Sequence, residues 1–145
     1  VTQLKTHAQD NEILRGKRIM LCEDNRLNAE IMQTLLRSQN MQVELAVNGQ
    51  IAVDNFTSHA PGYYAAIIMD IRMPVLDGLE ATKVIRALDR ADAKTIPIIA
   101  NSADAFSEEV EKFLAAGMNN YLAKPVDKNK LYEVLREELG KKQDI

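Results

Sequence analysis

The sequence predicts a doubly wound α/β fold, in which helices cover both faces of a parallel sheet. From Lys17 onward, short apolar runs alternate with longer amphipathic segments, and this alternation is typical of βαβ units. Two of the runs, 65–69 and 97–100, are apolar at every position, as expected of parallel strands that are buried on both faces. A chain of 145 residues, 46% of them hydrophobic, is long enough for one core and too short for two ordinary domains.

The first half of the domain contains two predicted pairs of a strand and a helix. Residues 18–22 form an apolar strand, and an amphipathic helix follows over about 25–38. Residues 42–47 alternate apolar and polar side chains, which indicates a half-exposed strand, and Asn48 is a favourable N-cap for the next helix, which closes at 59–62. The predicted apolar face of the first helix consists of Leu27, Ile31, Met32, Leu35 and Leu36.

The second half of the domain repeats this pattern three times. Strand 65–69 is followed by a turn, in which only Gly78 tolerates unusual φ values freely, and then by a helix. Strand 97–100 precedes a helix at about 107–116 that ends at Gly117, a favourable C′ residue. Strand 118–123 contains two asparagines, as an edge strand does, and the last helix covers 128–139.

The burial pattern also predicts the order of the strands. If the second and fifth strands are edges and the other three are central, the order 2-1-3-4-5 with right-handed crossovers satisfies every strand. Residues 1–16 are polar and lack a sustained period, so they are predicted to be a linker or a flanking segment. The domain is therefore expected at 17–141, with a tail at 142–145.

Composition excludes several functions. The 18 basic and 21 acidic side chains give a net charge of -3, which argues against nucleic-acid binding and against attraction to anionic membranes. No apolar run approaches the roughly 20 residues of a membrane span, and no signal-peptide pattern opens the chain. The single cysteine, Cys22, forms no internal disulfide, and we expect it to be buried in a reducing, cytoplasmic setting.

Three carboxylates follow the first and third strands. Glu23, Asp24 and Asp70 stand at the carboxyl ends of neighbouring strands, where ligands bind in such sheets. Crowded carboxylates repel one another and raise one another's pKa values unless a cation lies among them. Hard oxygen ligands of this number suit Mg²⁺, with Mn²⁺ as an alternative.

A hydroxyl and an amine are expected at the same edge of the sheet. Ser102 follows the fourth strand, and Lys124 follows the fifth strand directly before Pro125. An ammonium group is a compact point charge suited to phosphate oxygens. Carboxylates, a metal, a hydroxyl and a lysine together indicate phosphoryl transfer, in which positioning and charge neutralisation provide most of the catalysis.

At this point the sequence resembles a response-regulator receiver domain, which implies the flavodoxin-like (βα)5 fold. The resemblance extends from Lys17 to about Lys141 and is carried by CEDNRLNAEI (22–31), IIMDIRMPVLDGLEAT (67–82), PIIANSA (97–103) and NYLAKPV (120–126). Any single piece would be weak, whereas their joint occurrence in this order and at these spacings is highly specific.

The resemblance implies a role for each site residue. Asp70 accepts the phosphoryl group. Mg²⁺ is bound directly by Asp24 and Asp70, through a water by Glu23, and by the main-chain carbonyl of Arg72. Lys124 pairs with a phosphoryl oxygen, Ser102 reorients toward the new anion, and Tyr121 swings inward. The side chains of Arg72 and Asp104 set the lifetime of the phosphorylated state, and the Lys124-Pro125 peptide bond is cis.

The resemblance also implies the partners. The wording of the motifs is most similar to receivers joined to hybrid sensor kinases, so a histidine kinase domain or a histidine phosphotransfer protein is expected to supply the phosphoryl group. Phosphorylation is then expected to switch the surface formed by helix 107–116, strand 118–123 and helix 128–139. The domain catalyses only its own phosphorylation and dephosphorylation, in the cytoplasm or as the cytosolic part of a membrane-anchored kinase, with a weak dimer as one option.

Several alternatives remain open at this stage. A stand-alone response regulator has the same motifs. An aspartate-nucleophile phosphatase also places an acid after an apolar strand, but it usually has a second acid two residues later, where this chain has Arg72. A module that is never phosphorylated is the third option. Considered singly, Asp24 is compatible with a helix cap, Ser102 with a turn and Tyr121 with edge packing.

Overall fold

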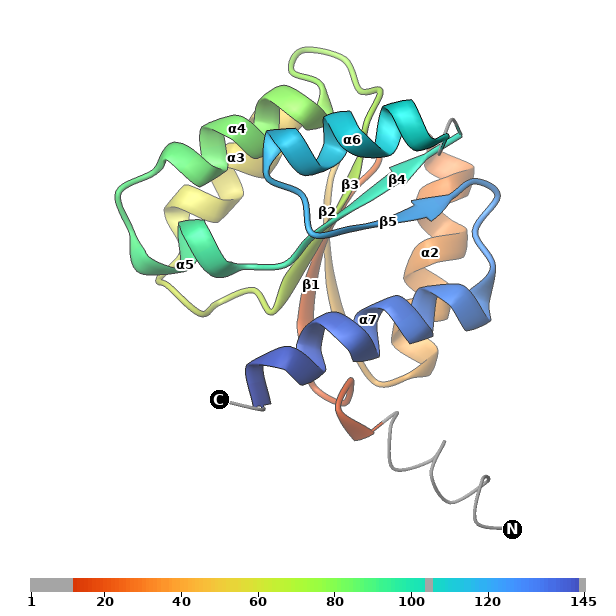
Figure 1. Ribbon diagram of the computed structural model, residues 1–145. Helices are drawn as coiled ribbons and strands as arrows, with labels where there is room; N and C mark the ends of the chain where they lie inside the picture. The colour runs from red at the N-terminus through yellow and green to blue at the C-terminus, as the bar shows by residue number, and fades with distance from the viewer. Residues whose placement is uncertain (1–11, 104–105, 144–145) are drawn as a thin grey trace, which may run out of the picture.

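The chain folds into a single five-stranded parallel sheet between two layers of helices, in a computed structural model that describes residues 12–103 and 106–143. Figure 1 shows α2 and α7 on one face of the sheet and α3, α4 and α6 on the other. The strand order is β2-β1-β3-β4-β5, which confirms the predicted order 2-1-3-4-5. The strands are β1 (Arg18–Cys22), β2 (Gln42–Ala46), β3 (Ala66–Asp70), β4 (Ile98–Ser102) and β5 (Asn120–Ala123).

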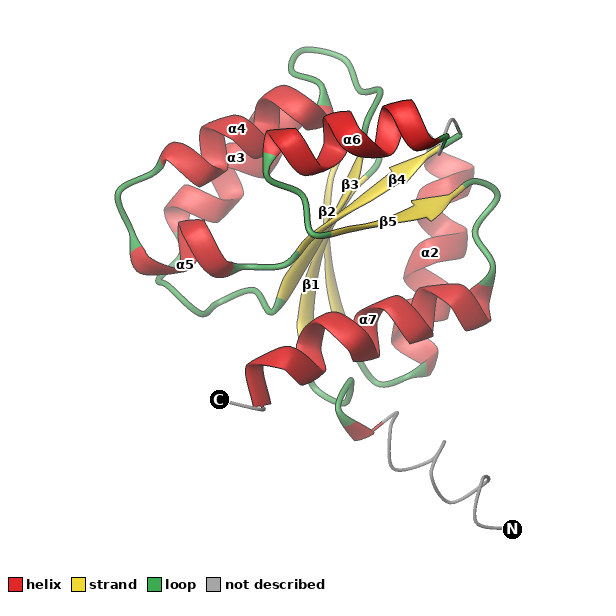
Figure 2. Cartoon of the chain, in the orientation of Figure 1, coloured by secondary structure: helices red, strands yellow, loops and turns green. Residues whose placement is uncertain are grey.

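All five predicted helices are present, and the structure adds a sixth among the described residues (Figure 2). The additional helix, α5, is a single short segment between α4 and β4, too short to show an amphipathic period in the sequence. Its Ala93 is fully buried. The helices are α2 (Arg26–Ser38), α3 (Gly49–Ser58), α4 (Gly78–Ala87), α5 (Ala91–Thr95), α6 (Ser107–Ala116) and α7 (Lys128–Gln143).

The core consists of two clusters, one on each face of the sheet. Alternate residues of a strand point to opposite faces, so Met20 packs with α3, α4 and α6, whereas its neighbour Leu21 packs with α2 and α7. Ile67 and Ile68 divide in the same way. All five residues of β3 are buried because helices cover both of its faces, which explains its unbroken apolar sequence.

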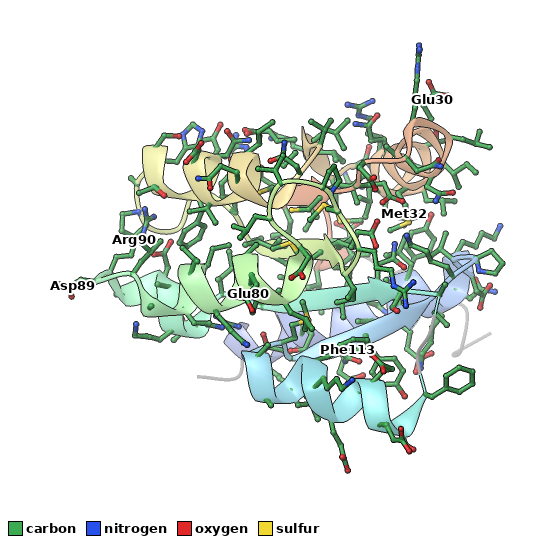
Figure 3. All side chains as sticks on the ribbon, turned by 90° about the horizontal axis from the view of Figure 1, so that it is seen from above. Glu30, Met32, Glu80, Asp89, Arg90 and Phe113 are labelled. Carbon is green, nitrogen blue, oxygen red and sulfur yellow. The ribbon has the colours of Figure 1, made fainter. Side chains whose placement is uncertain are left out.

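The apolar face predicted for α2 is partly wrong. Met32 and Leu36 are buried as expected, together with Ala29. Leu27 and Ile31, however, are 66% and 45% exposed. Figure 3 shows Met32 on the side of α2 toward the sheet and Glu30 pointing away from it. The spacing of residues 29, 32 and 36 determines the buried stripe, so α2 keeps two large apolar side chains in contact with solvent.

The residues before β1 contribute to the core. Leu14 is fully buried in the cluster beneath α2 and α7, and Ile13 packs against that cluster. Residues 1–11 of the predicted linker lie outside the described residues. The predicted caps are confirmed at Asn48, whose side chain accepts a hydrogen bond from the Ile51 N–H, and at Gly117, which has a φ of 111°.

Asp92 fastens α5 to the rest of the domain, and replacing it by asparagine is expected to destabilise the fold. Arg90 donates to both carboxylate oxygens at 2.7 and 3.1 Å, and the Gly62 N–H donates to Oδ2 at 3.1 Å. Both charged side chains are largely buried, so we expect the free energy of unfolding of Asp92→Asn to fall by about 1.5 kcal/mol in urea titrations. Glu133→Gln is the control, because the exposed Lys130–Glu133 pair contributes less than about 0.5 kcal/mol.

The same contact has a defined pH dependence. Hydrogen bonds from Arg90 hold the pKa of Asp92 below its ordinary value of 3.8. The stability that Asp92 contributes is therefore fully present above pH 3.8 and is lost as the pH falls through the lower pKa of the folded state. A difference between wild type and Asp92→Asn that disappeared well above pH 4 would contradict this assignment.

Candidate functional site

The three acids predicted to meet do meet. One oxygen from each of Glu23, Asp24 and Asp70 lies within 4.8 Å of the others. The sheet produces this arrangement because Cys22 pairs with Met69 in the parallel ladder, so the residues that follow the two strands emerge side by side. Glu23 is 1% exposed and Asp70 is 4% exposed, whereas Asp24 is at the surface.

Lys124 closes the cluster from the end of β5. Its Nζ lies 3.0 Å from Oδ1 of Asp70 and 3.5 Å from Oε1 of Glu23. The Lys124 N–H donates to the Ser102 carbonyl at 2.9 Å, which aligns the ends of β4 and β5. The Lys124-Pro125 peptide bond is cis, as the resemblance implied. One ammonium therefore faces two buried carboxylates.

A cavity of about 250 Å³ opens above the acids. Its lining includes Ser102 and Arg72, in agreement with the sequence prediction, and the Arg72 N–H donates to Oδ1 of Asp70 at 3.3 Å. The lining also includes Asn25 and Asn28, which the sequence analysis did not assign to the site. Asn25 is the N-cap of α2, and its side chain accepts a hydrogen bond from the Asn28 N–H at 2.9 Å. The sequence signal that could have placed Asn25 at the site is its position directly after the Glu23-Asp24 pair.

The remaining predicted residues are not brought to the acids by any described contact. Tyr121 is 39% exposed on edge strand β5, between the half-buried Asn120 and the buried Leu122. Its inward swing stays a prediction. Asp104 lies outside the described residues, so its role is likewise untested.

The oxygens of the cluster fit a divalent cation. Neither carboxylate oxygen of Glu23 accepts a hydrogen bond from the described residues, although both are buried. Burial of a carboxylate without hydrogen bonds is costly unless a proton or a cation compensates its charge. Three hard oxygen donors within 4.8 Å are a suitable partial shell for Mg²⁺, which keeps several waters.

The raised pKa of Glu23 also indicates that the cluster needs a cation to balance its negative charge. Burial raises the pKa of Glu23 to about 7; the nearby Asp70 carboxyl also raises it, whereas Lys124 opposes the rise. Burial likewise raises the pKa of the Cys22 thiol, which lies fully inside the core as predicted. Without a cation, we therefore expect Glu23 to be protonated at a higher pH than an ordinary glutamate.

The loop after Asp70 holds the next helix away from the acids. The Leu76 N–H donates to the Pro74 carbonyl, a γ-turn centred on Val75, whose φ is 70°. The positive φ of this turn is thus at Val75, although Gly78 is the residue that tolerates such a conformation freely. Gly78 is needed for a close approach: a Cβ at this position would lie 2.1 Å from the Asp70 carbonyl oxygen.

The fold and the site together define a class of domain, a doubly wound sheet with an acidic, lysine-flanked pocket at its carboxyl edge. The family model of the response regulator receiver domain matches residues 19–136. The chain therefore belongs to the response regulator receiver family.

Two proteins that are similar to this chain are large histidine kinases. The chain is 36% identical over 127 residues to hybrid signal transduction histidine kinase I of Dictyostelium discoideum, covering 86% of the chain and 7% of that protein. It is 36% identical over 138 residues to the osmosensing histidine protein kinase SLN1 of Saccharomyces cerevisiae, covering 92% of the chain and 11% of that protein. The chain thus spans a small part of the length of these relatives.

Two solved structures are informative. The receiver domain of sensor histidine kinase PA1611 from Pseudomonas aeruginosa, solved with a magnesium ion coordinated in the active site cleft, is 41% identical with a TM-score of 0.78, covering 86% of this chain and 98% of that one. The second is the co-crystal structure of the histidine phosphotransfer protein Ypd1 of Saccharomyces cerevisiae with the receiver domain of the response regulator Ssk1. The similarity is 31% identity with a TM-score of 0.74, covering 85% of this chain and 88% of that one.

Among the described residues, no helix is both long and apolar enough to cross a bilayer.

The raised pKa of Glu23 predicts how magnesium and pH act on stability. Between about pH 4.5 and pH 7 the folded state binds more protons than the unfolded state, so the free energy of unfolding should fall as the pH rises, by up to about 3 kcal/mol without metal. Mg²⁺ at pH 7 should restore it, because the cation replaces the proton. Urea titrations in EDTA and in Mg²⁺ measure both effects. In Glu23→Gln the pH slope should largely disappear; an unchanged pH slope in that variant would contradict the assignment.

Proposed function

We propose that this chain is the phosphoryl-accepting domain of a phosphorelay, in which Asp70 takes a phosphoryl group from phosphohistidine in a Mg²⁺-dependent reaction. The observation that carries the proposal is the convergence of Asp70, two further acids and Lys124, whose Nζ is 3.0 Å from Asp70 Oδ1. The names of the relatives support a place within a hybrid histidine kinase rather than in a stand-alone regulator. The alternative is that the same phosphoryl-accepting domain acts as a stand-alone response regulator.

The transfer itself requires an oxygen nucleophile and charge neutralisation. One carboxylate oxygen of Asp70 forms a bond to phosphorus, the P–N bond of the donor breaks, and its electron pair returns to the imidazole nitrogen. Lys124 neutralises charge on a phosphoryl oxygen from the position it occupies beside Asp70. The metal, when bound, withdraws charge from the same oxygens. Its ligands would be Asp24 and Asp70 directly, Glu23 through a water, and the main-chain carbonyl of Arg72; Mn²⁺ would suit the same oxygens.

The signal is read on a different surface. A dianionic group on Asp70 draws the Ser102 hydroxyl and Lys124 toward it, because both line the pocket above the acid. Ser102 and Lys124 end β4 and β5, so their movement biases the surface of α6, β5 and α7. Tyr121 follows inward as the edge of β5 rearranges. A partner that binds this surface then distinguishes the two states.

The donor docks next to the acids. Leu27 and Ile31 expose apolar surface on α2, whose N-cap Asn25 directly follows Asp24 and lines the pocket. Exposed apolar side chains of this size, next to a reactive site, are typical of a protein-docking surface. The Ssk1 receiver is solved in complex with a histidine phosphotransfer protein, which supports the same class of donor here, alongside a histidine kinase domain.

Incubation with acetyl phosphate and Mg²⁺, followed by intact mass measurement, tests the function. We expect a stable gain of one phosphoryl group that EDTA prevents. Rapid release of inorganic phosphate from diverse phosphate esters would instead show a phosphatase, and no gain under any condition would show an inert binding module. Transfer from a panel of phosphorylated histidine donors then identifies the partner class.

The side chain of Arg72 is proposed to set how long the phosphoryl group lasts. Arg72 lines the pocket above Asp70, where a long side chain limits the approach of water to an acyl phosphate. We expect Arg72→Ala to lose its phosphoryl group several-fold faster than wild type, followed by mass over time after removal of acetyl phosphate. Asp104 is proposed to act at the same mouth. Unchanged decay in both Arg72 and Asp104 variants, with an exposed-site variant such as Arg26→Ala as control, would reject the proposal.

A further inference from the structure

A second cavity lies beside the acids and is not used by the proposed chemistry. It has a volume of about 130 Å³ and is formed between α2 and the loop that joins β5 to α7. Ile31 and Met32 line it from α2, and Pro125 and Val126 line it from the loop. An apolar cavity of about 150 Å³ holds a benzene ring, so the volume of this cavity is close to that of a site for one ring.

A buried amide stands in the wall of this cavity. Asn101 of β4 is 3% exposed and lines the cavity, and its Oδ1 accepts no hydrogen bond from the described residues. It lies on the α2 and α7 side of the sheet, two residues after the buried Ile99. A buried amide oxygen without a hydrogen bond costs free energy, which an occupant with a hydrogen-bonding group recovers. A hydroxyl matches the amide in either orientation, because it both donates and accepts.

The charges at the cavity favour a neutral occupant. Lys124 also lines it, but its ammonium lies 3.0 Å from Asp70 and 3.5 Å from Glu23, so that charge is already balanced. No other charged side chain is among the described residues that line the cavity. An occupant is therefore selected by an apolar ring and one uncharged polar group.

The position of the cavity indicates where its occupant comes from. It shares Asn28 and Lys124 with the pocket above Asp70. Its rim residue Ile31 is 45% exposed and, with Leu27 one turn earlier, extends the apolar wall onto the surface of α2. A group seated in the cavity is thus continuous with the docking surface and adjacent to the phosphoryl acceptor.

We propose that this cavity receives a tyrosine-like side chain, an aromatic ring with one hydroxyl, that the phosphodonor protein presents when it docks on α2. The hydroxyl pairs with the Asn101 amide while the ring packs between Ile31 and Val126. This inference rests on the proposed function, since it assigns a recognition element to the donor of that reaction. The ring, bound in a cavity separate from the acids, would align the donor's phosphohistidine with Asp70.

The recognition is tested with two small probes and two proteins. Methyl NMR of Ile31 and Val126 is followed during titration with p-cresol and with toluene, for wild type and for Asn101→Leu. We expect p-cresol to bind wild type about threefold to tenfold more tightly than toluene, and this preference to vanish in Asn101→Leu. Retained toluene binding shows that the variant is folded with its cavity intact. If the variant does not fold, Ile31→Trp, which covers the mouth from an exposed position, should block both probes.

Two outcomes of that titration would overturn the proposal. The cavity is not a binding site if neither probe shifts the two methyl groups of wild type up to its solubility limit. The amide is not the recognition element if p-cresol and toluene bind wild type equally.

A competition experiment tests the source of the occupant. Wild-type protein is phosphorylated by acetyl phosphate or by phosphorylated Ypd1, each with and without p-cresol at a saturating concentration. We expect p-cresol to slow transfer from Ypd1 several-fold and to leave transfer from acetyl phosphate unchanged. Equal slowing of both would mean that the occupant disturbs Lys124, and no slowing of either would mean that the donor does not use the cavity; both outcomes reject the proposal. Absence of phosphorylation by acetyl phosphate alone would reject the proposed function instead.

Discussion

Replacing Asp70 with asparagine is expected to abolish the gain of a phosphoryl group from acetyl phosphate. The amide lacks the anionic oxygen that forms the bond to phosphorus, and it removes the partner that Lys124 holds at 3.0 Å. Because the Asp70 carboxyl also helps to raise the pKa of Glu23, the variant should lower that pKa as well. Intact mass measurement after incubation with Mg²⁺ and acetyl phosphate should show no added phosphoryl group.

The matched control is Asp54→Asn. Asp54 lies on the surface of α3, where it accepts a hydrogen bond from Gln50, and the same change of carboxylate to amide there should leave phosphorylation unaltered. A phosphoryl group that still appeared on Asp70→Asn would mean that another carboxylate, such as Asp24, is the acceptor. The assignment of the site would then be wrong, although the fold would stand.

Replacing Gly78 with alanine is expected to destabilise the domain by about 3 kcal/mol, near the upper end of what overpacking costs. The added Cβ would lie 2.1 Å from the carbonyl oxygen of Asp70 and 2.9 Å from its carbonyl carbon. Both atoms belong to the backbone, and the Gly78 N–H also donates to the Ile71 carbonyl at 2.8 Å, so the loop cannot yield without moving the acceptor. Thermal unfolding should show a fall of about 10 °C.

Gly140→Ala is the control for this glycine. Gly140 lies within α7, and the nearest side-chain atom to its added Cβ would be Cδ1 of Ile13 at 3.9 Å, an ordinary contact. Alanine is favoured over glycine inside a helix, so this variant should gain about 0.5 to 1 kcal/mol. Equal effects of the two substitutions would show that the close approach at Gly78 is relieved by movement of α4.

Local signals in the sequence were sufficient for the strand order and for every described helix except the short α5. The apolar runs at β3 and β4 indicated central parallel strands, and the polar positions of β2 and β5 indicated edges, so the strand order followed. The acids were also predictable, because carboxyl ends of adjacent parallel strands meet at one edge wherever the order is known. Asp70 and Lys124 come together for that reason, 54 positions apart in the sequence.

Other features depend on contacts between segments that no local pattern encodes. Periodicity assigned Leu27 and Ile31 to the core, whereas the packing of α2 on the sheet left them exposed. Gly78 was singled out for its tolerance of unusual φ values, but the close approach of its backbone to the Asp70 carbonyl is what requires a glycine, and Val75 takes the left-handed conformation.

The sequence by itself determined the class of the domain, the order of its strands and the residues that form the acidic site, because each of these follows from periodicity and from the ends of strands. Only the tertiary structure decided which face of α2 is buried, why Gly78 cannot carry a side chain, and that the buried Oδ1 of Asn101 accepts no hydrogen bond from the described residues that surround it. Those features arise where separate elements approach within a few ångströms, and the distance between two backbones is a property of the packed chain.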